Sequence, residues 1–121
     1  MGRDGRRALG CAGEDIACRE LRRRGYEILA RQFRTRRGEI DIVARDGSTM
    51  VFVEVKARAG QEFGGGAAAV TWRKQRRIAQ VALEFLARHG TTDVPCRFDV
   101  VVVTPGPVPR VEVFTHAFAG S

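Results

Sequence analysis

Acidic side chains stand inside two apolar runs of the sequence, residues 39–45 and 49–57. Asp41 lies in the first run and Glu54 in the second, and Lys56 follows Glu54 two residues later. A charge inside a buried strand is unfavourable unless it has a partner or a task. Two carboxylates and one ammonium group at this spacing could hold a divalent metal ion beside a phosphodiester.

Strand geometry predicts whether these groups can meet. Side chains alternate between the two faces of a strand, so Glu54 and Lys56 share a face. Asp41 shares that face only if the loop between the two strands has an even number of residues. A four-residue loop from Asp46 to Thr49 sets Asp41 opposite Glu54, with Cβ atoms about 5 Å apart.

Two carboxylates at that separation repel each other unless a cation neutralises them or one of them binds a proton. Oxygen ligands favour Mg²⁺ or Mn²⁺, and Lys56 would orient or activate an attacking water. The alternative is a solvated sheet face on which Glu54 and Lys56 simply pair. Because apolar residues flank both acids, the sequence favours the metal site over the surface ion pair.

The charge balance points to a polyanionic partner. The 121 residues carry 21 basic and 14 acidic side chains, a formal net charge of +7. Nucleic acid is the first candidate partner and an anionic membrane surface the second, while arginines that merely aid solubility are the alternative. Five residues form the predicted phosphate-contacting track: Arg36, Arg37, Arg73, Lys74 and Arg77.

The length and the cysteines limit the class of protein. A chain of 121 residues is enough for one domain, and its three cysteines lack the spacing of a zinc site. No apolar segment resembles a signal peptide or a membrane span. We therefore expect a cytoplasmic protein without a membrane partner.

Periodicity and turn residues predict an α/β order of elements. Residues 1–7 read as a disordered basic arm, followed by one domain over residues 8–121. Helices are expected over residues 8–24 and 71–88, with Thr71 as the N-cap of the second, and a glycine-rich loop over 58–69. Strands are expected over residues 26–33, 39–45, 49–57, 97–104 and 110–115. The natural closure is a central mixed β-sheet flanked by helices.

An ordered set of short motifs resembles a known family. The motifs are Gly13-Glu14-Asp15-Ile16-Ala17, Gly38-Glu39-Ile40-Asp41, Phe52-Val53-Glu54-Val55-Lys56, Lys74 and Arg97-Phe98-Asp99-Val100-Val101. Together they resemble the YraN-like family of bacteria, which is similar to Holliday junction resolvases and belongs to the PD-(D/E)xK nuclease superfamily. The resemblance runs in the same order over nearly the whole chain.

The resemblance implies a restriction-endonuclease-like αβββαβ core and a set of roles. Asp41 and Glu54 match the metal-binding acids, Lys56 matches the catalytic lysine, and the main-chain carbonyl of Val55 would be a further metal ligand. Glu14 matches a first-helix acid that completes the catalytic and metal-binding set. From its position alone, Glu14 could equally be an acid favoured by the helix dipole.

The leading hypothesis is therefore a nuclease dependent on Mg²⁺ or Mn²⁺ that hydrolyses phosphodiester bonds in DNA, with branched and single-stranded forms among its candidate substrates. The alternative is a non-catalytic nucleic-acid-binding module on a nuclease fold. Resolvase-like relatives act as dimers, so a homodimer is compatible with the resemblance, although the residues identify no dimer face. Gln32 stands where the family is expected to carry Asn, which puts a side-chain role at that position in doubt.

Overall fold

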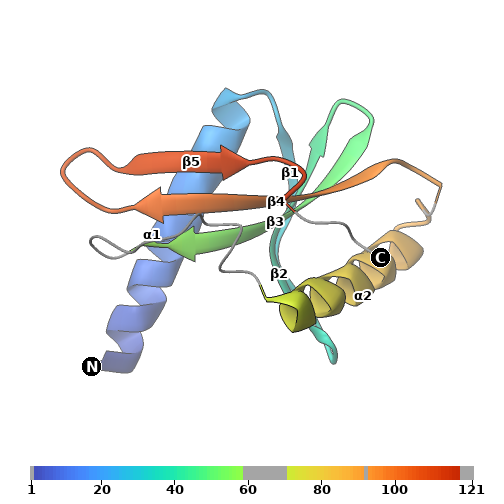
Figure 1. Cartoon of the computed structure of the whole chain (residues 1–121), viewed down its shortest axis with the longest axis horizontal. Coiled ribbons are helices and arrows are strands. Elements are labelled where there is room, and N and C mark those ends of the chain that lie inside the picture. Colours follow the sequence, from blue (N-terminus) through green and yellow to red (C-terminus); the bar gives the residue numbers. More distant parts are fainter. Residues whose placement is uncertain (1, 59–70, 92, 118–121) are drawn as a thin grey trace.

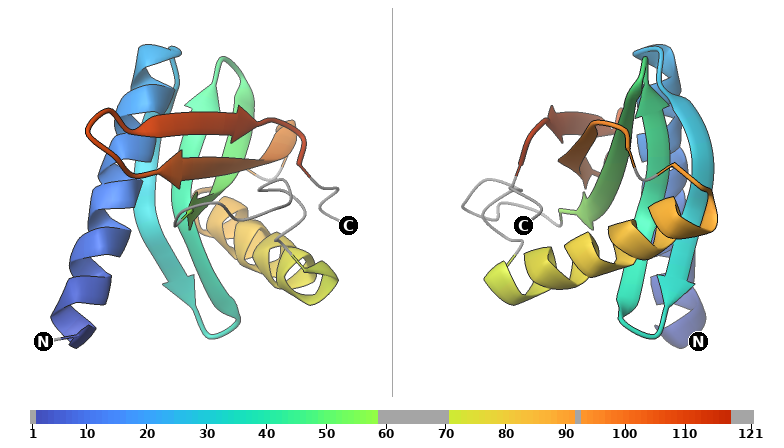
Figure 2. Two further views of the ribbon diagram at one scale, coloured as in Figure 1. Left: turned by 60° about the vertical axis from the view of Figure 1, so that its left-hand side comes forward. Right: turned by 90° about the vertical axis from the view of Figure 1, so that its right-hand side faces the viewer.

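The computed structural model describes residues 2–58, 71–91 and 93–117, with side chains from residue 12 onward. One sheet carries a helix on each face, as Figures 1 and 2 show. The elements in chain order are α1 (Gly2–Arg23), β1 (Glu27–Thr35), β2 (Gly38–Asp46), β3 (Thr49–Ala57), α2 (Trp72–Arg88), β4 (Cys96–Thr104) and β5 (Arg110–Phe114). This order and the single mixed sheet agree with the predicted restriction-endonuclease-like αβββαβ core.

The five strands follow one another in the sheet in sequence order, from β1 to β5. The β3–β4 pair is parallel and the other three pairs are antiparallel. Parallel neighbours need a crossover connection, and α2 lies within the one that joins β3 to β4. The crossover therefore brings α2 onto the sheet at the strand that carries Glu54.

Two apolar clusters, one on each face, hold the helices on the sheet. On one face, Ala17, Cys18 and Leu21 of α1 pack on strand residues that include Val51 and Val53. On the other face, α2 packs through Phe85, whose ring meets the rings of Phe33 and Phe52 at centroid distances of 5.1 and 6.1 Å. Because apolar side chains cover both faces, the central strands are near-continuous apolar runs, such as residues 100–103 of β4.

Most predicted boundaries agree with the structure, and one differs clearly. β3 has the predicted bounds, and the side chain of Thr71 caps α2 by accepting a hydrogen bond from the Lys74 amide at 3.1 Å. Helix α1 begins at Gly2, whereas residues 1–7 were expected to be a disordered arm. The prediction followed the apolar stripe, which starts later, whereas arginine and alanine support a helix without one. The predicted glycine-rich loop lies outside the described residues from position 59 onward.

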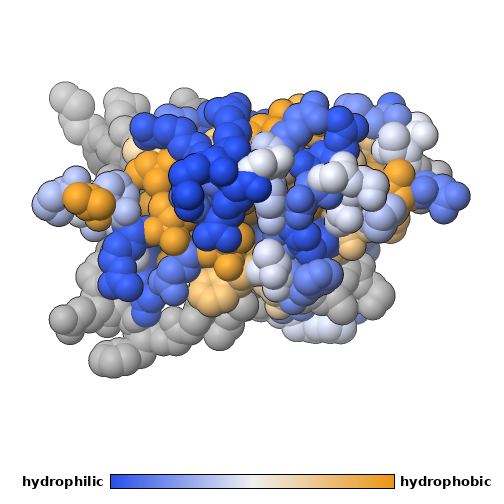
Figure 3. Space-filling model, turned by 90° about the horizontal axis from the view of Figure 1, so that it is seen from above, coloured by the Kyte–Doolittle hydropathy of each residue, from blue (hydrophilic) through white to orange (hydrophobic). Residues whose placement is uncertain are grey.

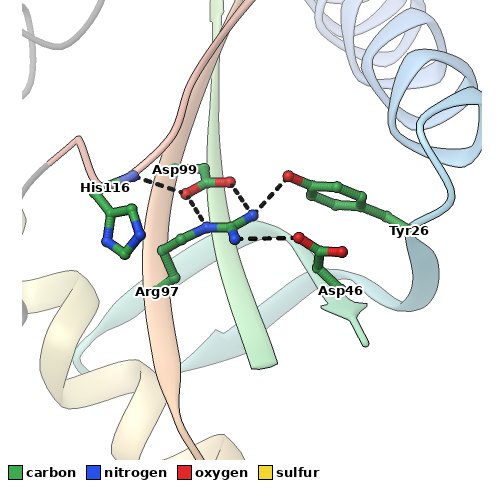
Figure 4. A network of polar contacts seen from close by, with 5 residues as sticks. All are labelled: Tyr26, Asp46, Arg97, Asp99 and His116. Atoms are coloured by element: carbon green, nitrogen blue, oxygen red, sulfur yellow. Dashed lines mark hydrogen bonds and ion pairs between the residues drawn. The ribbon is translucent and has the colours of Figure 1, made fainter. Parts of the chain in front are cut away.

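A buried polar network joins the sheet to the start of β1, as Figure 4 shows. The Arg97 guanidinium donates to both carboxylate oxygens of Asp99, at 2.9 and 3.0 Å, and also to Asp46 and to the Tyr26 hydroxyl. The backbone amide of His116 donates to Asp99 at 3.2 Å. Asp99 is fully buried, so its charge depends on these donors. Within the motif at residues 97–101, Asp99 is thus the ion-pair partner of Arg97.

The exterior is largely polar on the face drawn in Figure 3, where hydrophilic residues predominate and apolar residues form separate patches between them. Of the helices described, neither has the length and apolar character needed to cross a membrane.

The network generates a test of stability. Arg97→Met keeps the apolar stem but leaves the buried Asp99 without its main partner, so the free energy of unfolding should fall by about 3–5 kcal/mol. Urea denaturation at neutral pH measures this loss. The Arg97→Met, Asp99→Leu double variant should recover much of it because no buried charge is left unpaired.

The matched control is Arg45→Met, which removes an arginine that pairs with Glu27 on the exposed side of the sheet. The Arg45–Glu27 pair is largely solvated, so the loss of stability should stay within about 1 kcal/mol. Equal losses in Arg97→Met and Arg45→Met would contradict a stabilising role of the network.

Candidate functional site

The hairpin between β2 and β3 sets Asp41 and Glu54 on one face. Asp46 pairs with Thr49, so the turn itself contains two residues, with Gly47 at φ +62°. The sequence predicted a loop of four residues from Asp46 to Thr49, and both counts are even and give the same register. The ladder runs to the Ile42–Val53 pair, and one step further along it Asp41 faces Glu54.

The backbone pairing between β2 and β3 ends at the acidic pair, where the Asp41 side chain serves as the hydrogen-bond acceptor for the Val55 amide. Its Oδ2 accepts a hydrogen bond from the amide of Val55 at 2.8 Å. Beyond this point the β1–β2 hairpin runs away from β3 and β4 (Figure 2). The divergence leaves the two carboxylates at a gap between strands instead of under a continuous sheet.

Burial and mutual repulsion perturb this acidic pair. Desolvation, followed by the nearby negative charge of Glu54, raises the pKa of Asp41 to about 7, although the hydrogen bond from Val55 opposes the shift. Glu54 is itself buried, with 7% of its surface exposed. The pair therefore requires positive charge or a shared proton, as the spacing in the sequence predicted.

Positive charge reaches the pair from α2. The ammonium group of Lys74 forms an ion pair with Oε1 of Glu54. Thr71 fixes the first turn of α2, and the packing of Phe85 fixes the helix against the sheet. The Lys74 side chain is less than half exposed, so its charge acts on Glu54 partly shielded from solvent.

The acids line one wall of a cleft of about 520 Å³. The opposite wall belongs to α2 and carries three basic side chains. The lining residues are Gly38, Glu39, Asp41, Glu54, Thr71, Arg73, Lys74, Arg77 and Ile78. The cleft thus combines an acidic wall with a basic one, an arrangement suited to a metal ion and a phosphate group.

The predicted phosphate-contacting residues gather around this cleft. Arg73, Lys74 and Arg77 line it. Arg36 and Arg37 are exposed in the turn that leads into β2. The turn lies close to α2, since a Cβ built on Gly38 would come within 3.0 Å of the Arg77 side chain.

Lys56 lies on β3 next to the residues of the cleft, two positions beyond Glu54. It is half-buried, two residues beyond Glu54, and is not among the residues that line the cleft. Within the described parts of the chain, no carboxylate pairs with it. The surface-pairing alternative, in which Lys56 neutralises Glu54, is therefore wrong, because Lys74 occupies that position.

Glu14 is buried on the inner face of α1, with 5% of its surface exposed. Arg31 of β1 donates to its Oε1 at 2.7 Å, and the side-chain amide of Gln32 lies 3.4 Å from its Oε2. Gln32 has a left-handed backbone, with φ +51°, and in the register it faces Asp41. In the chain described, no three acidic, histidine or cysteine side chains converge on one point, so Glu14 does not join the pair directly.

The main chain of Val55 faces the acidic pair. Its amide donates to Asp41. The amide of Val55 therefore lies beside Asp41, and the role of its carbonyl as a main-chain metal ligand stays a prediction.

The sequence did not reveal two ion pairs of the structure, Lys74 with Glu54 and Arg31 with Glu14. Lys74 was predicted to contact phosphate but not to neutralise Glu54, and the Arg31 partner of Glu14 was not foreseen. Both pairs join residues at least 17 positions apart in the sequence. The one available signal for Lys74 was its place after the Thr71 N-cap, which fixed its turn of the helix but not its distance to β3.

The raised pKa of Asp41 gives a prediction for stability against pH. The folded chain holds the Asp41 proton more tightly than the unfolded chain, so this group stabilises the fold fully below about pH 4 and loses that contribution as pH rises through about 7. An asparagine side chain in its place could still accept from the Val55 amide and could donate to Glu54. Asp41→Asn should therefore unfold at higher urea concentration than the parent above about pH 7.

Urea denaturation with a chelator present, at steps between about pH 4 and about pH 8, measures the gap between parent and Asp41→Asn. The gap should open as pH rises. Asp93→Asn, at an exposed turn before β4, is the matched control and should follow the parent. Parallel curves for Asp41→Asn and the parent would contradict a shifted pKa.

Comparison with known proteins agrees with the resemblance seen in the motifs. Residues 13–103, which span the candidate acids and both lysines, match the family described as "Uncharacterised protein family UPF0102". A UPF0102 protein of Symbiobacterium thermophilum is 52% identical over 105 residues, covering 87% of this chain and 89% of the relative. A relative in Geobacter sulfurreducens is 51% identical, covering 91% and 88% of the two chains. The chain therefore belongs to the UPF0102, or YraN-like, family.

Proposed function

We propose that this protein is a nuclease dependent on a divalent metal ion that hydrolyses phosphodiester bonds in DNA. The observation that carries the proposal is the pair of half-buried Asp41 and buried Glu54, which line one cleft with basic side chains. Two carboxylates held close together and partly out of water destabilise a fold unless a cation accompanies them. A catalytic role explains why the sheet carries them.

The residues at the pair fit Mg²⁺ or Mn²⁺. The candidate ligands are the carboxylates of Asp41 and Glu54 and the carbonyl of Val55, all oxygen donors, which hard divalent cations prefer. Glu14 could contribute through Gln32 or through water, because Arg31 occupies one of its oxygens. A bound ion would polarise the phosphate and stabilise the charge that develops during attack by water.

The chain supplies the other functions from the two walls of the cleft. Arg73 and Arg77 would hold the phosphate backbone, and Arg36 and Arg37 would extend that contact past the turn. Lys56, two residues beyond Glu54 on the same strand, would orient the attacking water or offset developing charge. Lys74 would transfer from Glu54 to a phosphate oxygen once Glu54 engages another cation.

One observation favours the non-catalytic alternative. Lys74 already neutralises Glu54, so the protein can balance its acids without a metal ion. On that reading the cleft would bind nucleic acid through its basic wall alone. Binding would then be salt-dependent and indifferent to Mg²⁺, and removal of the acids would not weaken it.

Cleavage assays with matched variants test the proposal. Labelled duplex, flap, four-way-junction and single-stranded DNA, together with RNA, are incubated with Mg²⁺ or Mn²⁺. The parent should cleave at least one DNA form, and Asp41→Asn, Glu54→Gln and Lys56→Met should each reduce the rate by at least about a hundredfold, since each removes a group that acts at the reacting phosphate.

Glu27→Gln is the control for that assay, because Glu27 is an exposed acid at the far end of β1. It should cleave at the parent rate. Cleavage by Glu54→Gln at the parent rate would assign the activity to a contaminant. Salt-dependent binding without cleavage on any substrate would favour the accessory module.

Competition between Lys74 and the metal gives a second test, independent of turnover. Lys74→Met removes the resident cation, so the carboxylates should bind Mn²⁺ more tightly, by about tenfold for a change near 1.4 kcal/mol. Isothermal titration calorimetry without nucleic acid measures this affinity. Arg77→Met removes a lining charge that pairs with neither acid and should have a smaller effect. Weaker Mn²⁺ binding in Lys74→Met would contradict the competition.

A further inference from the structure

Trp72 is an exposed aromatic residue at the start of α2, between two residues that line the cleft. It is the single tryptophan of the sequence and the first residue of α2, and 66% of its surface is exposed. Its two chain neighbours, Thr71 and Arg73, both line the cleft. A large exposed indole ring therefore belongs to the turn of α2 that borders the cleft, and the core does not use it.

The surroundings of Trp72 carry positive charge. Arg73 and Lys74 line the cleft, Arg76 is exposed one turn along α2, and the first turn of this helix contains no acidic residue. A basic groove with an exposed aromatic ring is the combination with which proteins bind single-stranded nucleic acid. The groove attracts the backbone, and the ring offers a surface for a base.

We propose that Trp72 stacks on an unpaired nucleobase, so that the preferred substrate has a single-stranded segment beside the scissile phosphate. This inference rests on the proposed function and specifies its substrate class. Within a blunt duplex the faces of each base are covered by its neighbours, and a surface ring finds no free face. In a flap, gap or single strand, a base can leave its stack and lie on the indole.

Leu83 provides the matched control. It lies on the same helix and is also 66% exposed. The two residues are 11 positions apart, close to three helical turns, so they lie on the same side of α2. Neither side chain is among those that line the cleft, but Trp72 lies between two residues that do, whereas Leu83 is aliphatic and lies about three turns further along the helix. An exposed apolar stripe used for protein contacts would need both side chains, whereas base stacking needs Trp72 alone.

The single tryptophan gives a direct spectroscopic test of stacking. A Glu54→Gln background suppresses cleavage, and oligothymidine, which has no secondary structure of its own, is the probe. Titration with oligothymidine should quench the Trp72 emission, and titration with a blunt duplex of equal length should leave it nearly unchanged.

Affinity is measured in parallel by fluorescence anisotropy of labelled oligothymidine. Trp72→Ala should weaken binding by about ten- to a hundredfold, the usual range for one lost stacking contact. Trp72→Phe should retain most of the affinity, and Leu83→Ala should match the parent. Blunt duplex binding should be the same in all four proteins.

Three results would overturn the inference. The first is Trp72 emission that does not respond to oligothymidine, and the second is equal affinity for oligothymidine in Trp72→Ala and the parent. The third is an equal loss of affinity in Trp72→Ala and Leu83→Ala, which would indicate an apolar stripe used for protein contacts. Each leaves the nuclease proposal intact, since cleavage is assayed separately. Conversely, quenching and a Trp72-dependent affinity in a protein that cleaves nothing would support stacking and exclude hydrolysis.

Discussion

Electrostatic repulsion between two carboxylates, one buried and one half-buried, is the constraint on which the site depends. Asp41 and Glu54 share a face at the point where β2 and β3 separate, and each raises the free energy of the other's charged form. The chain relieves this repulsion through the Val55 amide, which donates to Asp41, and through Lys74, which pairs with Glu54. One source of relief comes from the neighbouring strand and the other from α2, and both carboxylates line the cleft.

The arrangement of the rest of the fold follows from the need to bring these groups together. The even number of residues in the turn between β2 and β3 sets Asp41 and Glu54 on the same face of the sheet. The parallel β3–β4 pair requires a crossover connection, and this connection carries α2 across the sheet. Phe85 anchors that helix on Phe33 and Phe52. On the other side of the sheet, the Arg97–Asp99 network joins β4 to the end of β2 and to Tyr26. The cleft is therefore lined by elements whose relative positions are fixed by packing and by buried hydrogen bonds.

Much of the site could be predicted because strand parity is local. The alternation of side chains and an even turn were enough to bring Asp41 and Glu54 to one face, although the turn is shorter than expected. The cap at Thr71 was equally local, since one hydroxyl and one amide three residues later define it. The start of α1 was missed because the prediction used the apolar stripe, and arginine-rich turns form a helix without one.

The sequence by itself determined the strand faces, the helix cap, the basic composition and the order of motifs that identifies the family, because each depends on neighbours within a few residues. Only the tertiary structure decided which charge meets which. Lys74, separated from Glu54 by a crossover, supplies its counter-ion, while Lys56, two residues away, does not. Glu14 similarly pairs with Arg31 across the space between α1 and β1. Ion pairs depend on distance in space, and those distances were set by how the two helices pack on the sheet.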